Sequence, residues 1–253
     1  MDPRRSIVPI VEIDEINDND IVGLAGTGFF VGPVPTLVTA AHVFRTDLTE
    51  GHGYAVAYVG KDGARMARII PSEIVRSKQF DIAAVRRASL PGIEPLKLTP
   101  LIVPLNADVM TYEYSTTRIV RDSAGKRHVY FHPLTHKGNL MRASEHDDDW
   151  LPEIPKWETS FPALQGASGA PVIAHEGSGV VGMLVSNLER HLLPAQVVRI
   201  EAPDGVTEET KYFLPTGIAI RAIAIGIFLQ ELGIDADTFL RKSWQADWYG
   251  NSK

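Results

Sequence analysis

The sequence predicts an all-β protein built from two β-rich halves, with a helix near the C-terminal end. Short runs of β-branched and aromatic residues alternate with turn signals through most of the 253 residues. Four prolines between Pro91 and Pro104 divide these runs into two groups. Length and a hydrophobic content of 44% allow one large domain or two small ones.

Six runs in the first half, from about residue 6 to residue 103, are expected to be strands. They are Ile7–Val11, Gly28–Val31, Thr36–Thr39, Tyr54–Val59, Arg65–Pro71 and Ile82–Arg86. The Lys61-Asp62-Gly63 triplet between two of these runs is typical of a β-hairpin turn. The proline-rich residues 91–104 are then expected to cross to the second half.

Seven runs in the second half, from about residue 107 to residue 220, are expected to be strands. They are Val109–Tyr114, Arg118–Arg121, His128–His132, Gly138–Arg142, Ala170–Ala174, Gly179–Val185 and Phe213–Ile220. Two segments fit no strand pattern: the acidic residues 144–155 and the mixed, proline-containing residues 192–210. Both are expected to be surface loops.

The C-terminal segment is expected to be helical. Apolar residues at helical spacing occupy residues 221–232, and Gly233 is suited to end that helix. Residues 235–249 predict a second short helix with an apolar face. That face consists of Phe239, Leu240, Trp244 and Trp248. Packing against the core is favoured for this extension, with docking of a partner as the alternative.

Composition narrows the function class. The chain has no cysteine, so no disulfide can form. The apolar run after Met1 is too short for a secretion signal, and no stretch reaches the roughly 20 apolar residues of a membrane span. The net charge is −6 and the basic residues are scattered, which argues against nucleic acid as a partner. A cytoplasmic protein without a membrane partner is expected.

The hexapeptide Gly166–Pro171, with the sequence Gly-Ala-Ser-Gly-Ala-Pro, is the most informative chemical signal. Small residues on both sides of Ser168 let the backbone turn sharply and present the side chain. They also leave backbone N–H groups free to point at one spot, as an oxyanion hole requires. Taken alone, the segment fits an ordinary turn as well as it fits a nucleophile.

Two upstream segments change that balance. The first is Leu37-Val38-Thr39-Ala40-Ala41-His42-Val43, which follows a Gly-Thr-Gly strand beginning at Gly26 and reads as a strand ending in a histidine. The second is Phe80–Val85, which places Asp81 at the mouth of an apolar strand. By itself each residue fits a structural role. The three together supply a nucleophile, a base and a residue to orient the base.

These segments resemble those of the trypsin-like (chymotrypsin-fold) serine peptidases, and most closely the cysteine-free bacterial branch with the HtrA-type enzymes. His42, Asp81 and Ser168 follow that family's order, with gaps of 39 and 87 residues (81 − 42 and 168 − 81). The resemblance implies two packed six-stranded antiparallel β-barrels with a C-terminal helix, and a bacterial source. It assigns residues 1–103 to the first barrel, 104–222 to the second and 223–253 to a helical extension.

The resemblance also implies the roles of the site residues. Ser168 would attack the scissile carbonyl, His42 would act as general base and then acid, and Asp81 would orient the imidazole. The backbone N–H groups of Gly166 and Ser168 would form the oxyanion hole. No cofactor is needed for this chemistry.

A switch by N-terminal cleavage is not expected. In the activated digestive enzymes an aspartate precedes the nucleophile and binds a newly cut N-terminus, whereas this chain has Ala167 there. The segment Ile21–Leu24 imitates such a terminus but follows Asp20 rather than a basic cleavage site. Control is therefore expected to act through loop ordering or a regulatory protein partner.

Substrate contacts are assigned by the same resemblance. The residues are Pro162, Ala163, Gln165, Leu184, Val185, Ser186 and Asn187. The first three would line the S1 pocket, and residues 184–186 would form an edge strand that pairs with the substrate backbone. Asn187 would narrow or polarise the pocket. Since no charge stands at the pocket base, a small or medium apolar P1 side chain (the residue before the cleaved bond) is expected.

Metal binding is not expected. His128, His132 and His136 lie close in sequence, but no cysteine and no His-Glu-x-x-His motif accompanies them. The acidic run Glu145–Asp149 lacks the spaced oxygen ligands of a calcium loop, so a solvated loop is favoured.

The leading hypothesis is a serine endopeptidase that acts on protein or peptide substrates. Two alternatives remain open from the sequence. One is a catalytically silent trypsin-like module that binds a peptide or a partner without turnover. The other is the peptidase component of a larger regulated system.

Overall fold

The structure is a computed structural model, and it describes most of the chain. The described residues are 2–17, 20–60, 63–86, 90–99, 103–123, 125, 127–144, 155–174, 179–191, 198–201, 207–210 and 213–234. Within them, no helix has both the length and the apolar character needed to cross a membrane.

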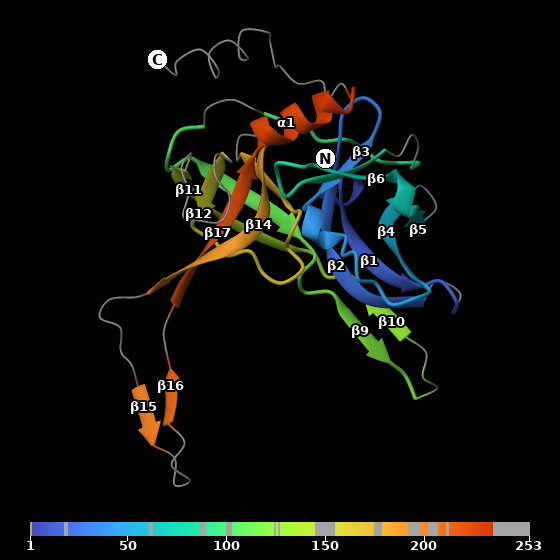
Figure 1. The fold of residues 1–253 in the computed structure, drawn as a ribbon, viewed down its shortest axis with the longest axis horizontal. Coiled ribbons are helices and arrows are strands. Elements are labelled where there is room, and N and C mark those ends of the chain that lie inside the picture. The colour runs from blue at the N-terminus through green and yellow to red at the C-terminus, as the bar shows by residue number, and fades with distance from the viewer. Residues whose placement is uncertain are drawn as a thin grey trace.

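The first half forms an antiparallel sheet with the strand order β5-β4-β1-β2-β3-β7-β6 (Figure 1). The strands are β1 (Ile7–Asp14), β2 (Asp20–Val31), β3 (Thr36–Thr39), β4 (His52–Gly60), β5 (Gly63–Ile69), β6 (Ile74–Arg76) and β7 (Ala83–Arg86). All six expected strands are present, and β4 and β5 form the expected hairpin, in which Gly60 pairs with Gly63. The sequence missed β6 because it has three residues, too few for a recognisable alternation.

The second half contains a closed six-stranded barrel in the order β11-β12-β17-β14-β13-β8. Its strands are β8 (Asp108–Glu113), β11 (Leu134–Ser144), β12 (Lys156–Thr159), β13 (Pro171–Ala174), β14 (Val180–His191) and β17 (Phe213–Arg221). A closed barrel leaves no unpaired edge along most of its length. The predicted all-β fold class is confirmed, including a six-stranded barrel and the C-terminal helix.

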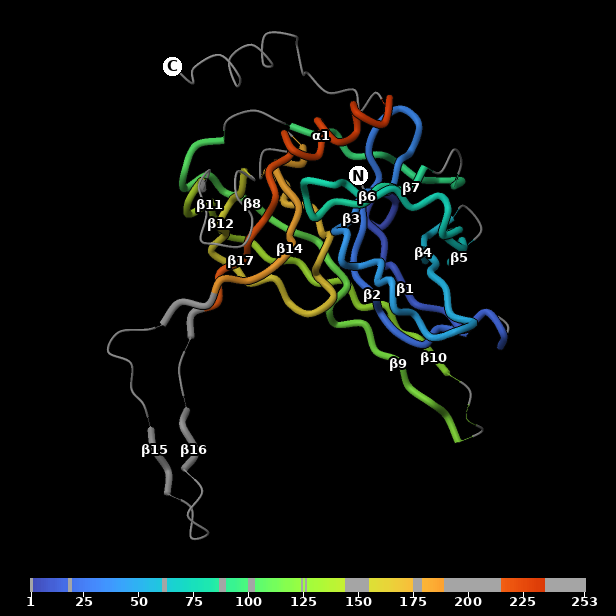
Figure 2. The backbone as a smooth tube through the Cα atoms, in the orientation of Figure 1, coloured from blue at the N-terminus to red at the C-terminus, as the bar shows by residue number. Residues whose placement is uncertain are grey.

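Two short hairpins stand apart from the barrel. β9 (Arg118–Arg121) pairs only with β10 (Arg127–Tyr130) among the described strands, so the prediction that both belong to the barrel was wrong. Figure 2 shows this hairpin extending from the body beside β2, where Arg127 forms an ion pair of 3.2 Å with Asp20. β15 (Val198–Glu201) and β16 (Thr207–Thr210) form the second hairpin, in a segment expected to be a loop.

The connection between the halves is bonded to both of them. Leu96 N–H donates to the carbonyl of Phe30 at 2.7 Å, and Thr99 N–H donates to the carbonyl of Val180 at 2.8 Å. Val180 N–H in turn donates to the carbonyl of Lys97 at 2.8 Å. The proline-rich segment therefore fixes β2 of the first half relative to β14 of the second.

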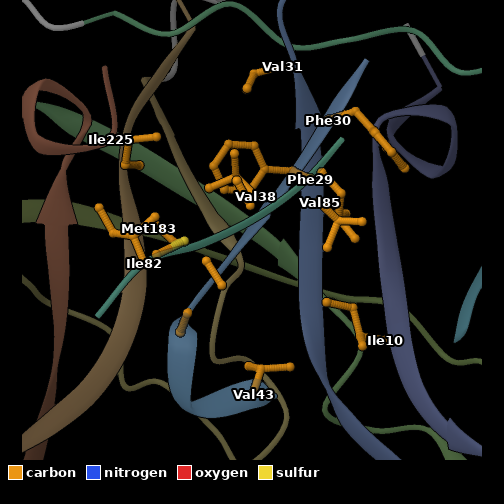
Figure 3. Packing of buried hydrophobic residues seen from close by; sticks show 14 of the residues in the cluster. Ile10, Phe29, Phe30, Val31, Val38, Val43, Ile82, Val85, Met183 and Ile225 are labelled. Carbon is orange, nitrogen blue, oxygen red and sulfur yellow. The ribbon is translucent and has the colours of Figure 1, made fainter. Parts of the chain in front are cut away.

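One hydrophobic core spans both halves. Figure 3 shows Met183 of β14 and Ile225 of the C-terminal helix beside Ile82, Val38 and Phe29 of the first half, and all five are buried. Because this core is shared, the two halves are held in a fixed relation, as a site built from both requires.

The helix α1 (Ala222–Glu231) closes this core and ends as expected. Gly233 has a left-handed φ of 67°, and Ile234 N–H donates to the carbonyl of Leu229 at 2.9 Å. The guanidinium of Arg86, on β7, donates to the carbonyl of Leu232, which ties the end of α1 to the first half. The second predicted helix, over residues 235–249, and the acidic run 145–149 lie outside the described residues.

Candidate active site

His42 lies in a single 3-10 turn (Ala41–Val43) that directly follows β3. Ala40 has an extended backbone (φ −67°, ψ 140°), and the next residues turn back. The side chain of Val43 is buried at 3% exposure, whereas that of His42 is 48% exposed. The buried valine anchors the turn, so the imidazole is held at the surface.

Asp81 uses both carboxylate oxygens to hold His42. Oδ2 lies 2.6 Å from Nδ1 of the imidazole, and Oδ1 accepts the backbone N–H of His42 at 3.0 Å. The backbone is joined as well, because Ala41 N–H donates to the carbonyl of Asp81 at 3.3 Å. Since Nδ1 is taken by the carboxylate, Nε2 is the imidazole nitrogen left for proton transfer.

The environment of Asp81 favours its ionised form. Partial burial raises the pKa of the carboxyl group. The side-chain hydrogen bond from His42, the electrostatic interaction with its ring and the backbone N–H groups of His42 and Ala41 lower the pKa by more than burial raises it. The net pKa lies below the ordinary value. A carboxylate that stays ionised can stabilise the imidazolium that forms when His42 accepts a proton.

Ser168 lies on a loop that is held in place by hydrogen bonds of its backbone. The carbonyl of Ser168 accepts the N–H of Thr27 at 2.9 Å, and the next N–H, of Gly169, donates to Leu184 at 2.8 Å. The carbonyl of Gly166 accepts the hydroxyl of Thr27 at 2.8 Å. Two of the peptide groups around the serine are therefore bonded to residues far away in sequence.

The residues before Ser168 form a type II turn. Ala167 N–H donates to the carbonyl of Leu164 at 2.8 Å. The third turn residue, Gly166, has φ of 96°, whereas Gln165 has no positive φ. Among the described residues, no hydrogen bond takes up the N–H of Gly166 or of Ser168. These are the two groups predicted to form the oxyanion hole.

Gly26 brings the histidine turn and the serine loop together. A Cβ added to Gly26 would lie 2.7 Å from Cγ2 of Val43 and 2.9 Å from the carbonyl oxygen of Ser168. The neighbour of His42 and the backbone of Ser168 thus converge on one glycine of β2. In the described part of the chain, the hydroxyl of Ser168 makes no hydrogen bond with His42.

The predicted pocket residues Ala163 and Asn187 are directly bonded to each other. Ala163 N–H donates to Oδ1 of Asn187, and Nδ2 of Asn187 donates to the carbonyl of Ala163, both at 2.6 Å. The side chain of Asn187 therefore reaches from β14 to the segment before the serine loop. Gln165 is exposed and Pro162 is partly buried.

Leu184 differs from its predicted role as a substrate contact. Its side chain is fully buried, its carbonyl accepts Gly169 N–H at 2.8 Å, and its N–H donates to Ala170 at 2.9 Å. Both backbone groups thus support the serine loop from behind. Pairing of β14 with β13 ends at Met183, whereas residues 186–191 pair with β17 and with no other described strand. The free edge suited to a substrate strand begins after Leu184.

Sequence reasoning missed the residues that anchor the serine loop. Thr27 is fully buried, and its carbonyl accepts the hydroxyl of Thr39 at 2.7 Å. A Cβ on Gly169 would lie 2.1 Å from both of those oxygens. The flanking glycines of Thr27 were a usable signal, because they mark a strand that another backbone approaches closely.

A buried carboxylate lies near the same loop. Glu113 has no exposed surface, and it accepts the N–H of Ser115 at 2.6 Å and its hydroxyl at 2.8 Å. Nε2 of His136 lies 3.3 Å from Glu113, and the imidazole stacks on Phe161. Over the described residues, no three His, Cys, Asp or Glu side chains are grouped as they would be around a metal ion.

Comparison with known proteins identifies the family of this chain. The family model of the trypsin-like peptidase domain matches residues 26–183, which is more than half of the chain. The chain belongs to the trypsin-like peptidase domain family. The match begins at Gly26 and ends at Met183, so it includes His42, Asp81 and Ser168. A search of curated proteins found no match.

Solved structures share the fold at low sequence identity. The MamO protease domain of Magnetospirillum magneticum superposes with a TM-score of 0.56 at 16% identity, covering 89% of this chain and 96% of that one. The active form of the Rv3671c protease of M. tuberculosis gives 0.52 at 18%, with 91% and 82% covered. Mouse neuropsin, a serine protease, gives 0.57 at 11%, with 92% and 96% covered.

Proposed function

We propose that this protein is a serine endopeptidase that cleaves peptide bonds through an acyl-enzyme on Ser168. Two observations carry the proposal: Asp81 holds His42 through two hydrogen bonds, and two N–H groups of the adjacent serine loop bind no acceptor among the described residues. A serine hydroxyl is a weak nucleophile at neutral pH and needs an adjacent, oriented base. The site has residues suited to each of these tasks.

In the proposed mechanism, Oγ of Ser168 attacks the scissile carbonyl while Nε2 of His42 accepts its proton. The tetrahedral intermediate collapses when His42 donates that proton to the leaving amine, which leaves an ester on Ser168. Water, deprotonated by His42, then hydrolyses the ester and regenerates the hydroxyl. The ionised Asp81 stabilises the imidazolium in both half-reactions.

The carbonyl oxygen of the substrate becomes negative in each tetrahedral intermediate. In the proposal, that charge is stabilised by the N–H groups of Gly166 and Ser168, since both lack another acceptor in the described part of the chain. Fixed backbone donors are effective here because they need no reorganisation during the reaction.

The substrate is proposed to be an extended peptide that pairs with the free edge of β14 after Leu184. The amide of Asn187, bonded to Ala163 at 2.6 Å in both directions, spans the segments assigned to the S1 pocket. A side chain that occupies this space restricts the P1 residue to small or medium apolar groups. Rapid cleavage after Arg, with none after Ala or Val, would contradict this assignment.

The proposal is tested by labelling with a fluorophosphonate, followed by mass spectrometry of the adduct. The wild type should be labelled on Ser168, and Ser168→Ala should not be labelled. Ser123→Ala, which changes an exposed serine near the β9–β10 hairpin, serves as the matched control and should be labelled like the wild type. A folded wild type that is never labelled would instead favour the catalytically silent, peptide-binding module.

A further inference from the structure

Thr27 binds two separate peptide groups of the serine loop. Its N–H donates to the carbonyl of Ser168 at 2.9 Å, and its hydroxyl donates to the carbonyl of Gly166 at 2.8 Å. Thr27 lies on β2 of the first half, 139 residues before Gly166. One residue of the first half therefore holds the loop on both sides of Ala167.

The hydroxyl of Thr27 has its direction fixed by a second contact. Tyr114 N–H donates to this oxygen at 3.3 Å, which leaves the hydroxyl proton free to donate to Gly166. The carbonyl of Thr27 is held by the hydroxyl of Thr39 at 2.7 Å, and the residue has no exposed surface. A buried donor with three fixed contacts is a rigid support.

The serine loop needs such a support at Gly166. Glycine has no Cβ, so its peptide groups rotate with little steric resistance. A type I turn would suit the same four residues, and there the peptide before the third residue points the opposite way. In that form, Gly166 N–H would turn away from the position of the substrate oxygen. Ala167 has a buried, apolar side chain and offers no polar anchor against this rotation.

The bond from Thr27 acts on the neighbouring peptide. The Gly166–Ala167 peptide is held at its oxygen by Thr27 and at its N–H by the carbonyl of Leu164 at 2.8 Å. These two bonds fix the plane of the peptide that follows Gly166, and the turn that accompanies them is type II, with φ of 96° at Gly166.

We propose that Thr27 is a positioning residue whose hydroxyl fixes the Gly166 peptide so that the N–H groups of Gly166 and Ser168 can bind the substrate oxyanion. This role rests on the proposed peptidase function. The anchor comes from β2, so docking of the two halves orders the oxyanion loop and no cut N-terminus is needed.

Three variants separate this role from simple stability. Thr27→Val removes the hydroxyl with little change in shape, and Thr27→Ser keeps it. Thr36→Val is the matched control, because Thr36 is also buried in the first sheet and its hydroxyl donates to Val34 at 3.1 Å, away from the loop. For each protein, kcat and KM are measured on a peptide with Ala at P1, together with the Tm.

Thr27→Val should lower kcat about 10- to 100-fold with KM within about twofold, since oxyanion donors act mainly in the transition state. Thr27→Ser should keep kcat within about threefold of wild type, because the donor is retained. Thr36→Val should lower the Tm by about as much as Thr27→Val does, but its kcat should equal that of wild type.

A folded Thr27→Val enzyme with wild-type kcat would overturn the proposal, as would an equal loss of kcat in Thr36→Val. If Thr27→Val does not fold, Thr27→Ala removes the same hydroxyl and is judged by the same criteria.

Crystal structures of wild type and variant give a readout that needs no activity. The proposal expects Gly166 to keep a positive φ in the wild type and to lose it in the variant, and an unchanged turn would contradict it. A wild type that is inert yet shows this difference would reject the peptidase function alone.

Discussion

The histidine turn and the serine loop are held in different ways. His42 is fixed by the carboxylate of Asp81, 39 residues away, through contacts made within the first half. The loop of Ser168 is fixed through its own backbone, by Thr27 from the first half and by Leu184 from behind. The base thus depends on one side chain, whereas the oxyanion site depends on how the halves meet. The two regions should respond differently to substitution.

The largest effect is expected at the side-chain contact. Asp81→Asn should lower kcat by about 10⁴-fold, as in the serine peptidase on which that estimate was made, because the amide disfavours the tautomer that His42 needs. Circular dichroism should show an intact fold. Measured peptide hydrolysis within tenfold of wild type would show that Asp81 does not orient the base.

The next effect is expected from a clash in the serine loop. In Gly169→Ala, the new Cβ would lie 2.1 Å from the carbonyl of Thr27 and from the hydroxyl of Thr39. The loop must move away from β2, so kcat/KM should fall at least about 100-fold, as when an oxyanion donor is lost.

Gly125→Ala is the matched control for this backbone effect. Gly125 has φ of 81°, close to the 87° of Gly169, but a Cβ there would meet no atom of the described residues within 4 Å. Gly125→Ala should lower the free energy of unfolding by about 1–2 kcal/mol, because a residue with a Cβ is strained in the left-handed conformation. Its kcat/KM should be unchanged. Similar losses of kcat/KM in both variants would count against the anchoring role of β2.

A smaller effect is expected at the predicted pocket. Asn187→Gly removes the amide that bridges to Ala163, so larger P1 side chains should enter. The ratio of kcat/KM for Phe over Ala at P1 should rise about tenfold or more, in the range that pocket volume usually supplies. An unchanged ratio in a peptide library digest would place the P1 side chain elsewhere.

The smallest effect is expected in the pH dependence of stability. The pKa of Asp81 is lower in the folded state than its ordinary value, so its contribution to stability is present above the unfolded pKa. That contribution disappears as the pH falls below about 4 and through the folded pKa. Urea titrations of Asp81→Asn should therefore show a shallower loss of stability on acidification than wild type. An equally steep loss of stability at low pH in both proteins would contradict the assignment.

The sequence was most informative where a residue acts through a short local motif. Two local patterns, a histidine after Thr39-Ala40-Ala41 and an aspartate before an apolar strand, predicted that His42 and Asp81 interact. In the structure, Nδ1 of His42 lies 2.6 Å from Oδ2 of Asp81. Most strands were also recognisable, because runs of β-branched and aromatic residues are separated by turn signals.

The remaining features depend on long-range contacts, and a local pattern does not identify the partner residues. Thr27 looked like an ordinary strand residue, since its partner Gly166 lies 139 residues away. β12 was missed because it has four residues of mixed polarity, although Trp157 and Thr159 are buried in the barrel. β9 and β10 were assigned to the barrel because their residues favour strands, and propensity does not say which strands pair.

The most direct test of the account is a pre-steady-state measurement with a p-nitrophenyl ester of a short apolar acyl group. An acyl-enzyme on Ser168 predicts a burst of about one nitrophenolate per active site, followed by slower turnover. Ser168→Ala should abolish the burst, and intact-mass spectrometry should find the acyl group on the wild type alone. Linear release at the same rate in both proteins, with no acyl adduct, would contradict the central claim.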